Sequence, residues 1–280
     1  MCLVDDQRAD NRPIGIFDSG LGGLTVVRAI RNLLPHEDII YLGDNARVPY
    51  GSRSKETICR YAIDDLRFLL AKEVKLVVVA CNTVATTAME ALQKLEGDVP
   101  ILDVVQAGVM ALFDQLSVPR KVLILGTRAT INSDAYRLLI HRRSPQTSVR
   151  SQACPLFVPL VEEGIDDESI VLPIIHYYLD KPLLCQPDAI ILGCTHYPLL
   201  KKEIAKVAAR IQLIDSAEAT AQFLRRYLEE HQGLAAFRRD PGVLRCFVTD
   251  MPLSFHHLAS RFLGYQPDFV EKIQFDDTLQ

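Results

Sequence analysis

The chain has 280 residues, of which 49% are hydrophobic and 24% are charged, enough apolar material for one or two globular domains. Its formal net charge of −4 provides no broad attraction to nucleic acid or anionic lipid, so a small-molecule partner is favoured. No run approaches the roughly 20 apolar residues of a membrane span, and residues 1–12 are polar and acidic rather than signal-like. We therefore expect a cytoplasmic protein without nucleic-acid or membrane partners.

Apolar runs alternate with amphipathic segments along most of the chain. We expect strands near 14–17, 38–42, 75–80, 100–103, 121–125, 149–153, 188–192 and 211–214, with helices between most of them. Such alternation is typical of α/β proteins with mainly parallel sheets. Residues 217–230 then predict a long helix, followed by a short strand at 244–250 and a final helix.

The order of these elements predicts two similar α/β domains related by pseudo-two-fold symmetry, with the active site in the cleft between them. We expect a discontinuous first domain, 13–107 with 217–280, because the tail should pack back on the first half. The second domain should cover 108–216, and residues 1–12 form a leader of unassigned role.

Two loops rich in turn residues follow early strands. The loop 18–23, Asp-Ser-Gly-Leu-Gly-Gly, precedes a helix beginning near Leu24, so its amides could hold an anion. It lacks the Gly-Lys-Ser/Thr ending of a phosphate loop and the dinucleotide fingerprint, whereas a carboxylate suits the same amides. The loop 43–52 is equally consistent with an ordinary surface turn.

Two cysteines occupy matching places in two similar phrases. Cys81 closes the run Leu-Val-Val-Val-Ala and precedes Asn-Thr, while Cys194 closes Ile-Ile-Leu-Gly and precedes Thr-His. An apolar run precedes each phrase at a comparable distance, 14–19 before Cys81 and 122–127 before Cys194. The carboxyl end of a buried strand is where open α/β sheets bind ligands, so the two thiols should line one cleft.

A pair of thiols in one cleft suits general acid–base chemistry. A helix N-terminus favours the thiolate, so either sulfur can hold or release a proton near working pH. If a carbon acid lies between them, one thiol removes its proton and the other returns a proton to the opposite face. Either cysteine alone is as readily explained by packing in the core, since buried free cysteine is common.

Polar residues beside the thiols are candidates for assisting them. His196 could orient or protonate Cys194, and Asp18 could play the matching part near Cys81, unless it merely caps a helix. Glu162 and Glu163 fit a solvated acidic corner better than a site. Asn82, Thr83 and Thr195 directly follow the thiols and are candidates for binding a carboxylate. Cys-Thr-His offers too few ligands for zinc, so no metal is expected.

Seven segments then resemble the glutamate racemase family of bacterial peptidoglycan synthesis. They are Gly-Ile-Phe-Asp-Ser-Gly-Leu-Gly-Gly-Leu (15–24), Tyr-Leu-Gly-Asp (41–44), Pro-Tyr-Gly (49–51), Ala-Cys-Asn-Thr (80–83), Leu-Gly-Thr (125–127), Phe-Val-Pro-Leu-Val-Glu (157–162) and Leu-Gly-Cys-Thr-His-Tyr-Pro-Leu (192–199). The likeness runs in order from about residue 13 to 270 and includes Val-Thr-Asp (248–250).

The resemblance implies a racemase that interconverts L- and D-glutamate without any cofactor. Cys81 and Cys194 match the family's two acid/base thiols, Cys81 acting on D-glutamate and Cys194 on L-glutamate. The residues matching polar groups that assist the thiols are Asp18, Glu162 and His196. Those matching substrate-binding positions are Asp18, Ser19, Pro49, Tyr50, Gly51, Asn82, Thr83, Thr195 and His196, with Thr127 a further candidate.

One departure from the family pattern lies beside the first thiol. The family usually continues with Ala-Ser-Ala, whereas this chain has Val84, Ala85 and Thr86, which moves the hydroxyl one place along the helix. That change affects the expected hydrogen bonding near Cys81. A hinge between the domains is expected near 105–109 and 214–218.

Other activities fit parts of the sequence. A racemase for aspartate or another amino acid would use the same paired thiols, and a Cys-His-Asp hydrolase would use one of them as a nucleophile. A two-domain amino-acid sensor would need neither thiol. Cysteines at 2, 59, 81, 154, 185, 194 and 246 are unlike a secreted disulfide framework and should be free. A homodimer is an expected assembly for a soluble enzyme.

Overall fold

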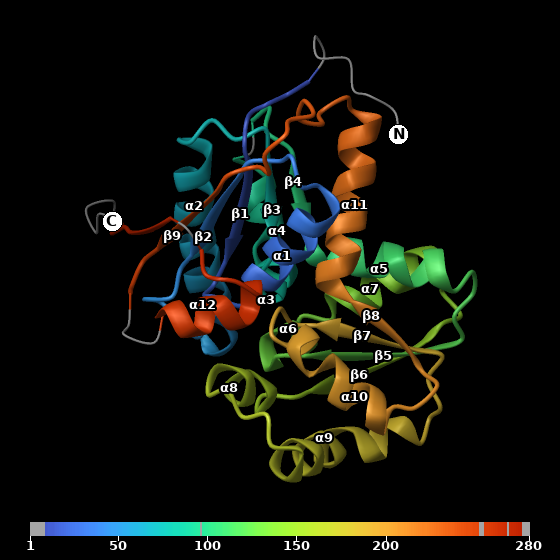
Figure 1. The fold of residues 1–280 in the computed structure, drawn as a ribbon. Helices are drawn as coiled ribbons and strands as arrows, with labels where there is room; N and C mark the ends of the chain where they lie inside the picture. Colours follow the sequence, from blue (N-terminus) through green and yellow to red (C-terminus); the bar gives the residue numbers. More distant parts are fainter. Residues whose placement is uncertain (1–8, 96, 252–254, 268, 276–280) are drawn as a thin grey trace.

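Two parallel sheets flanked by helices make up the molecule (Figure 1). The computed structural model describes residues 9–95, 97–251, 255–267 and 269–275. Most of the expected leader, including Cys2, lies outside them. The predicted α/β class is confirmed, and each strand expected before residue 216 is present with its ends within one residue of the prediction.

The first sheet has the strand order β10-β9-β2-β1-β3-β4 and the second has β6-β5-β7-β8. All of the pairings between neighbouring strands are parallel. The strands are β1 (Ile14–Asp18), β2 (Ile39–Gly43), β3 (Leu76–Val79), β4 (Ile101–Asp103), β5 (Lys121–Gly126), β6 (Ser148–Ala153), β7 (Ala189–Gly193), β8 (Gln212–Asp215), β9 (Leu244–Val248) and β10 (Val270–Lys272).

The two sheets repeat one topology. In chain order, the first four strands of each half are arranged second-first-third-fourth, so β3 and β7 occupy equivalent places. Strands β1, β3 and β7 are fully buried, as expected where helices cover both faces of a parallel sheet. Since the thiols follow β3 and β7, the fold presents them from equivalent strand ends.

Helices cover the sheets and join the two halves. They are α1 (Leu24–Leu33), α2 (Lys55–Leu70), α3 (Asn82–Thr87), α4 (Met89–Gln93), α5 (Val104–Gln115), α6 (Arg128–Asn132), α7 (Ala135–Arg143), α8 (Phe157–Glu162), α9 (Glu168–Leu183), α10 (Lys201–Val207), α11 (Ser216–Glu230) and α12 (Phe255–Leu263), with 3₁₀ turns at Tyr50–Ser52 (η1) and Tyr197–Leu200 (η2). Among the described residues, none of these helices combines the length and apolar character needed to cross a membrane.

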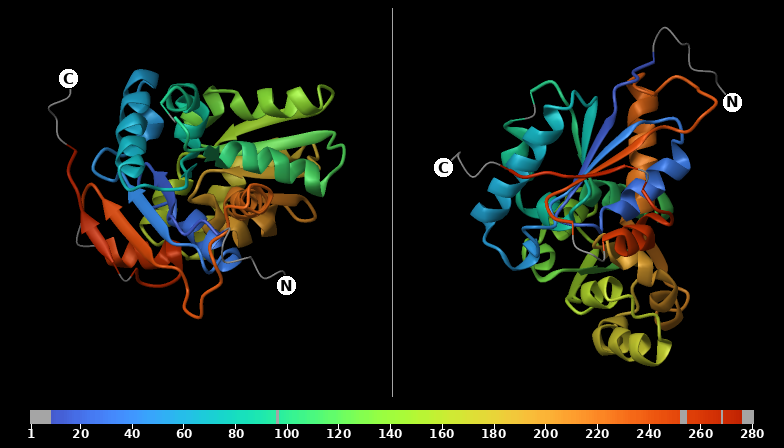
Figure 2. Two further views of the ribbon diagram at one scale, coloured as in Figure 1. Left: turned by 90° about the horizontal axis from the view of Figure 1, so that it is seen from above. Right: turned by 60° about the vertical axis from the view of Figure 1, so that its left-hand side comes forward.

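The chain passes between the halves at two capped helix starts. Asp103 accepts hydrogen bonds from the amides of Val105 and Gln106 at the start of α5. Asp215 does the same for Ala217 and Glu218 at the start of α11. Helix α11 packs against both α1 and α5, so it lies along the junction of the two lobes (Figures 1 and 2).

The segment after α11 returns to the first sheet. Strand β9 pairs with β2, and β10 extends the same edge. The sequence did not predict β10, because its three residues, Val-Glu-Lys, carry neither an apolar run nor a clear alternation. Only pairing with β9 makes this segment a strand.

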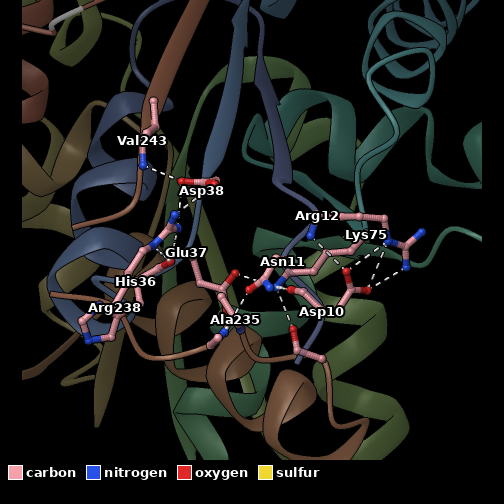
Figure 3. Close-up of polar contacts among 12 residues, drawn as sticks. Asp10, Asn11, Arg12, His36, Glu37, Asp38, Lys75, Ala235, Arg238 and Val243 are labelled. Carbon is pink, nitrogen blue, oxygen red and sulfur yellow. Dashed lines mark hydrogen bonds and ion pairs between the residues drawn. The ribbon is translucent and has the colours of Figure 1, made fainter. Parts of the chain in front are cut away.

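A buried ion pair lies at the amino-terminal ends of the strands of the first sheet (Figure 3). Lys75 Nζ lies 2.6 Å from Glu37 Oε2 and donates to the carbonyls of Asp10 and Gly233 at 2.8 and 2.7 Å. The amide of Ala235 donates to the other Glu37 oxygen at 2.8 Å. These bonds join the residues before β1 to those after α11 at the amino ends of the strands, the end opposite both thiols.

Candidate active site

Both thiols stand where a strand gives way to a helical segment. Cys81 is the N-cap residue of α3 and is 5% exposed, while Cys194 directly follows β7 and is 6% exposed. Because parallel strands end at the same edge of a sheet, this position also gathers the loops that follow β1 and β5.

The thiol of Cys81 has an acidic neighbourhood. Its Sγ lies 3.3 Å from Ser19 Oγ, to which it donates a hydrogen bond. Burial and the nearby carboxylate of Asp18 raise the pKa of Cys81 to about 12. At neutral pH this cysteine therefore carries its proton.

Asp18 ends β1 and holds the glycine loop in shape. Its Oδ2 accepts hydrogen bonds from the amides of Gly20 and Gly23 at 3.2 and 3.0 Å. Its Oδ1 is buried and has no hydrogen-bond partner within the described part of the chain. Burial raises the pKa of this carboxyl, whereas the nearby His196 and the loop amides act in the opposite direction. Helix α1 is capped at Gly23, so Asp18 does not serve as its N-cap.

The thiol of Cys194 faces a histidine that a carboxylate supports. Its Sγ lies 3.9 Å from His196 Nδ1, and His196 Nε2 lies 2.9 Å from Glu162 Oε1 at the end of α8. Burial opposes charge on the ring, but the bonds to Cys194 and Glu162 outweigh it and raise the pKa of His196 to about 10. At neutral pH the ring is therefore protonated and places a positive charge beside the Cys194 sulfur.

Glu162 and Glu163 have different surroundings. Glu163 is exposed, in keeping with the interpretation of this turn as a solvated acidic corner. Glu162 is 49% exposed at its side chain yet binds His196, a contact that the sequence pattern did not indicate. The two residues are adjacent in sequence, so only the packing of α8 against η2 distinguishes them.

The glycine loop brings the two thiol clusters together. A Cβ on Gly22 would lie 2.4 Å from Thr195 Oγ1 and 2.5 Å from His196 Cε1, so only glycine fits there. Thr25 Oγ1 donates to the carbonyl of Thr195 at 2.9 Å. The loop that Asp18 holds therefore packs directly against the segment that carries Cys194, and the charge of His196 acts on the Asp18 carboxyl beside Cys81.

The remaining candidates lie around this cluster. Thr83 and Thr127 bring their hydroxyls to 3.2 Å of each other across the two halves. A Cβ on Gly51 would lie 3.5 Å from the Cβ of Thr127, which places the backbone after Pro49 beside the same pair. The 43–52 loop thus reaches the junction of the two sheets and is more than a surface turn.

Tyr50 is buried, and its hydroxyl is engaged away from the thiols. It donates a hydrogen bond to Asp44 Oδ2 and lies 3.4 Å from Asp65 Oδ2. Arg47 pairs with both carboxylates. The sequence pattern did not indicate this network, although Asp44 belongs to the Tyr-Leu-Gly-Asp segment (41–44). The Tyr50 hydroxyl is therefore occupied by these carboxylates.

Two further residues beside the thiols were not predicted. Phe262 of α12 is fully buried and packs edge-on against the His196 ring, with centroids 5.1 Å apart. Tyr136 of α7 donates a hydrogen bond to Asn82 Oδ1 at 2.7 Å. Thr86, the displaced hydroxyl, bonds to the backbone carbonyls of Asn82 and Thr83 at 2.9 and 3.1 Å.

The matched sheets and the joined thiol clusters define a two-lobed α/β enzyme with its site between the lobes. The model of the Asp/Glu/hydantoin racemase family matches residues 23–224. The chain therefore belongs to the Asp/Glu/hydantoin racemase family, and it is an amino-acid racemase.

Relatives named glutamate racemase resemble the chain over nearly its whole length. The protein of Syntrophus aciditrophicus is 47% identical over 263 residues, and that of Neisseria meningitidis serogroup A is 45% identical over 265; each match covers 94% of this chain and 96% of the relative. The crystal structure of glutamate racemase from Francisella tularensis in complex with D-glutamate matches with a TM-score of 0.88 at 42% identity, covering 95% of this chain and 99% of that one.

Proposed function

We propose that this racemase interconverts L- and D-glutamate by a two-thiol acid/base mechanism that needs no cofactor. The observation that supports the proposal is the packing of the glycine loop beside Cys81 against Thr195 and His196 beside Cys194, at the equivalent ends of two matching strands. The naming of its relatives as glutamate racemases and the D-glutamate complex of the Francisella tularensis enzyme support the choice of substrate.

The protonation states favour one direction of entry. Cys81 carries its proton, and the imidazolium of His196 lies beside the Cys194 sulfur, which we assign as the base. In this state Cys194 removes the α-proton of L-glutamate, and Cys81 donates a proton to the opposite face to give D-glutamate. The reverse reaction begins from the state in which Cys194 holds the proton and Cys81 has lost it.

Two buried atoms suit the ends of an amino acid. The carboxylate oxygen Asp18 Oδ1 and the amide nitrogen Asn82 Nδ2 both lack a hydrogen-bond partner among the described residues. Buried polar groups without partners are uncommon, and a bound substrate would satisfy them: its ammonium group on Asp18 and a carboxylate on Asn82. The other residues proposed to contact glutamate are Ser19, Pro49, Tyr50 and Gly51 through the loop backbone, Thr83, Thr127, Thr195 and His196.

Removing an α-proton from an amino acid carboxylate creates a carbanion-like centre of high charge. Preorganised amides and side chains in a closed, water-poor site must stabilise it. We propose that the lobes close about a hinge at 105–109 and 214–218, the starts of α5 and α11, with 13–107 plus 217–280 as one domain and 108–216 as the other. Asp103 and Asp215, which cap these helices, would stay with their helices during such motion.

The product suggests the role of the enzyme in the cell. D-Glutamate is proposed to supply peptidoglycan synthesis and so to support cell-wall biogenesis and cell shape. The described cysteines are free, which suits a cytoplasmic, reducing compartment. A homodimeric assembly is part of the same proposal.

Isotope exchange tests the function directly. Incubation with each enantiomer of glutamate in deuterated water should place deuterium at the α-carbon and produce the opposite enantiomer. A sensor would leave the amino acid unlabelled, and faster turnover of L-aspartate than of L-glutamate would overturn the substrate assignment. A hydrolase would keep full activity when one of the two thiols is replaced.

A further inference from the structure

One tyrosine from the second half reaches the residue that follows the first thiol. Tyr136, on α7, is 2% exposed, and its hydroxyl donates to Asn82 Oδ1 at 2.7 Å. Asn82 is 3% exposed and is the first residue of α3 after Cys81. The bond therefore crosses between the halves inside the site.

This bond decides which end of the Asn82 amide remains available. With Oδ1 accepting from Tyr136, the NH₂ group at the other end is buried and lacks a partner within the described residues. Leaving such a donor unpaired destabilises the ligand-free site. A substrate carboxylate would recover this cost, whereas a flipped amide would present an oxygen to it and repel it.

The ring of Tyr136 also contacts the strand that leads to the second thiol. A Cβ on Gly193 would lie 3.1 Å from Tyr136 Cε2, so glycine at this position lets the ring lie close to the backbone of β7. Gly193 immediately precedes Cys194. A single side chain thus touches both thiol-bearing segments, one through its ring and the other through its hydroxyl.

We propose that Tyr136 is a positioning residue of the racemase: it fixes the Asn82 amide with its NH₂ group toward the substrate carboxylate. This inference rests on the proposed function, because it assigns the acceptor of that NH₂ group to glutamate. Tyr136 acts through Asn82 and does not itself contact the reacting atoms.

A double-mutant cycle tests the proposal. Tyr136→Phe keeps the ring and removes the hydroxyl, so we expect kcat/KM for glutamate to fall about tenfold, mainly through a higher KM. In an Asn82→Ala background the same change should have no further effect, because the group that Tyr136 orients is gone. Losses that multiply in the double variant, an unchanged Tyr136→Phe enzyme, or a loss confined to kcat would overturn it.

A second variant keeps the test decisive if Asn82→Ala does not fold. Asn82→Asp keeps the shape and the acceptor for Tyr136 but replaces the NH₂ donor, so KM should rise at least as much as in Tyr136→Phe. An Asn82→Asp enzyme with unchanged KM would count against the proposal. Tyr178→Phe is the matched control, a buried tyrosine of the same half that packs on Phe157, and it should keep wild-type activity.

The two hypotheses fail in different ways. If the unmodified enzyme does not racemise glutamate, the proposed function is wrong. If it does, and the cycle shows no coupling between Tyr136 and Asn82, the positioning role alone is wrong.

Discussion

The two thiols share a place in the fold but differ in their surroundings. Cys81 lies beside the carboxylate of Asp18 and the neutral hydroxyl of Ser19, and its pKa rises to about 12. Cys194 lies beside an imidazolium that Glu162 supports. The repeated topology supplies matching positions, while a carboxyl group lies near one sulfur and a protonated imidazole near the other.

Replacing either thiol should have the largest effect. We expect Cys81→Ser and Cys194→Ser each to lower the rate of racemisation by roughly 10²–10⁴-fold or more. The reason is that a serine hydroxyl gives up its proton far less readily than a cysteine thiol. Circular dichroism or chiral chromatography of the product measures this. As a control, each variant should still eliminate the leaving group from one enantiomer of a β-substituted glutamate, using the remaining base. Full activity in either variant would contradict a two-thiol mechanism.

Asp18→Asn addresses the Cys81 side of the comparison. The asparagine side chain can still accept hydrogen bonds from the loop amides, but it carries no negative charge beside the thiol. We therefore expect kcat/KM to fall about 100-fold. The loss must be equal in both directions, because enantiomers have an equilibrium constant of one. A specific effect of Asp18 on Cys81 should instead appear as a larger α-deuterium isotope effect with D-glutamate than with L-glutamate. An equal increase for both enantiomers would show that Asp18 does not act specifically with Cys81.

The raised pKa of His196 predicts how stability depends on pH. The folded state holds the proton to about pH 10, whereas an unfolded histidine loses it near 6.5. The contribution to the free energy of unfolding is therefore complete below pH 6.5 and is lost as pH rises through 10. Between pH 6 and 8.5 we expect a loss on the order of 2 kcal/mol in urea denaturation. His196→Gln should flatten this slope, and an unchanged slope would contradict the assignment.

Glu162→Gln tests the support of the imidazolium. Because Glu162 is half exposed, solvent weakens its charge interaction, and we expect only about a tenfold loss of kcat/KM. The pKa of His196 should fall, which NMR titration of the ring can follow. Glu163→Gln is the matched control on the exposed neighbour and should leave both the activity and the pKa of His196 unchanged.

Thr86→Ala should have the smallest effect. The Thr86 hydroxyl bonds to carbonyls of its own helix, so its removal should change kcat/KM less than twofold. A larger loss would show that the displaced hydroxyl assists Cys81 after all. Val84→Ala offers a comparison that leaves the hydroxyl in place.

The buried carboxyl groups at the two ends of the first sheet have different partners. Glu37 pairs with Lys75 through one oxygen and accepts from the amide of Ala235 through the other (Figure 3). The Oδ1 atom of Asp18 has neither a hydrogen bond nor an ion pair among the described residues. An incompletely paired buried carboxylate is costly, so the thiol end of this sheet is the less satisfied of the two.

Most of the helices and strands could be predicted from the sequence, because the pattern that marks each of them lies within the element itself. The apolar runs before Cys81 and Cys194 are long enough to mark buried strands, and Asp18-Ser-Gly-Leu-Gly-Gly marks a loop at a strand end. Strand β10 could not be predicted because it forms only by pairing with β9. The network of Tyr50, Asp44 and Arg47 could not be predicted because the spacing of these residues carries no periodic signal.

The order of residues along the chain is enough to predict the α/β alternation and the two equivalent strand ends that carry the thiols. The neighbours of each thiol, in contrast, follow from the packing of distant segments. Glu162 reaches His196 from 34 positions away, and Tyr136 reaches Asn82 from 54. Contacts of this kind depend on how the two sheets pack together, and that packing depends on the shape and charge of whole surfaces rather than on the spacing of residues along the chain.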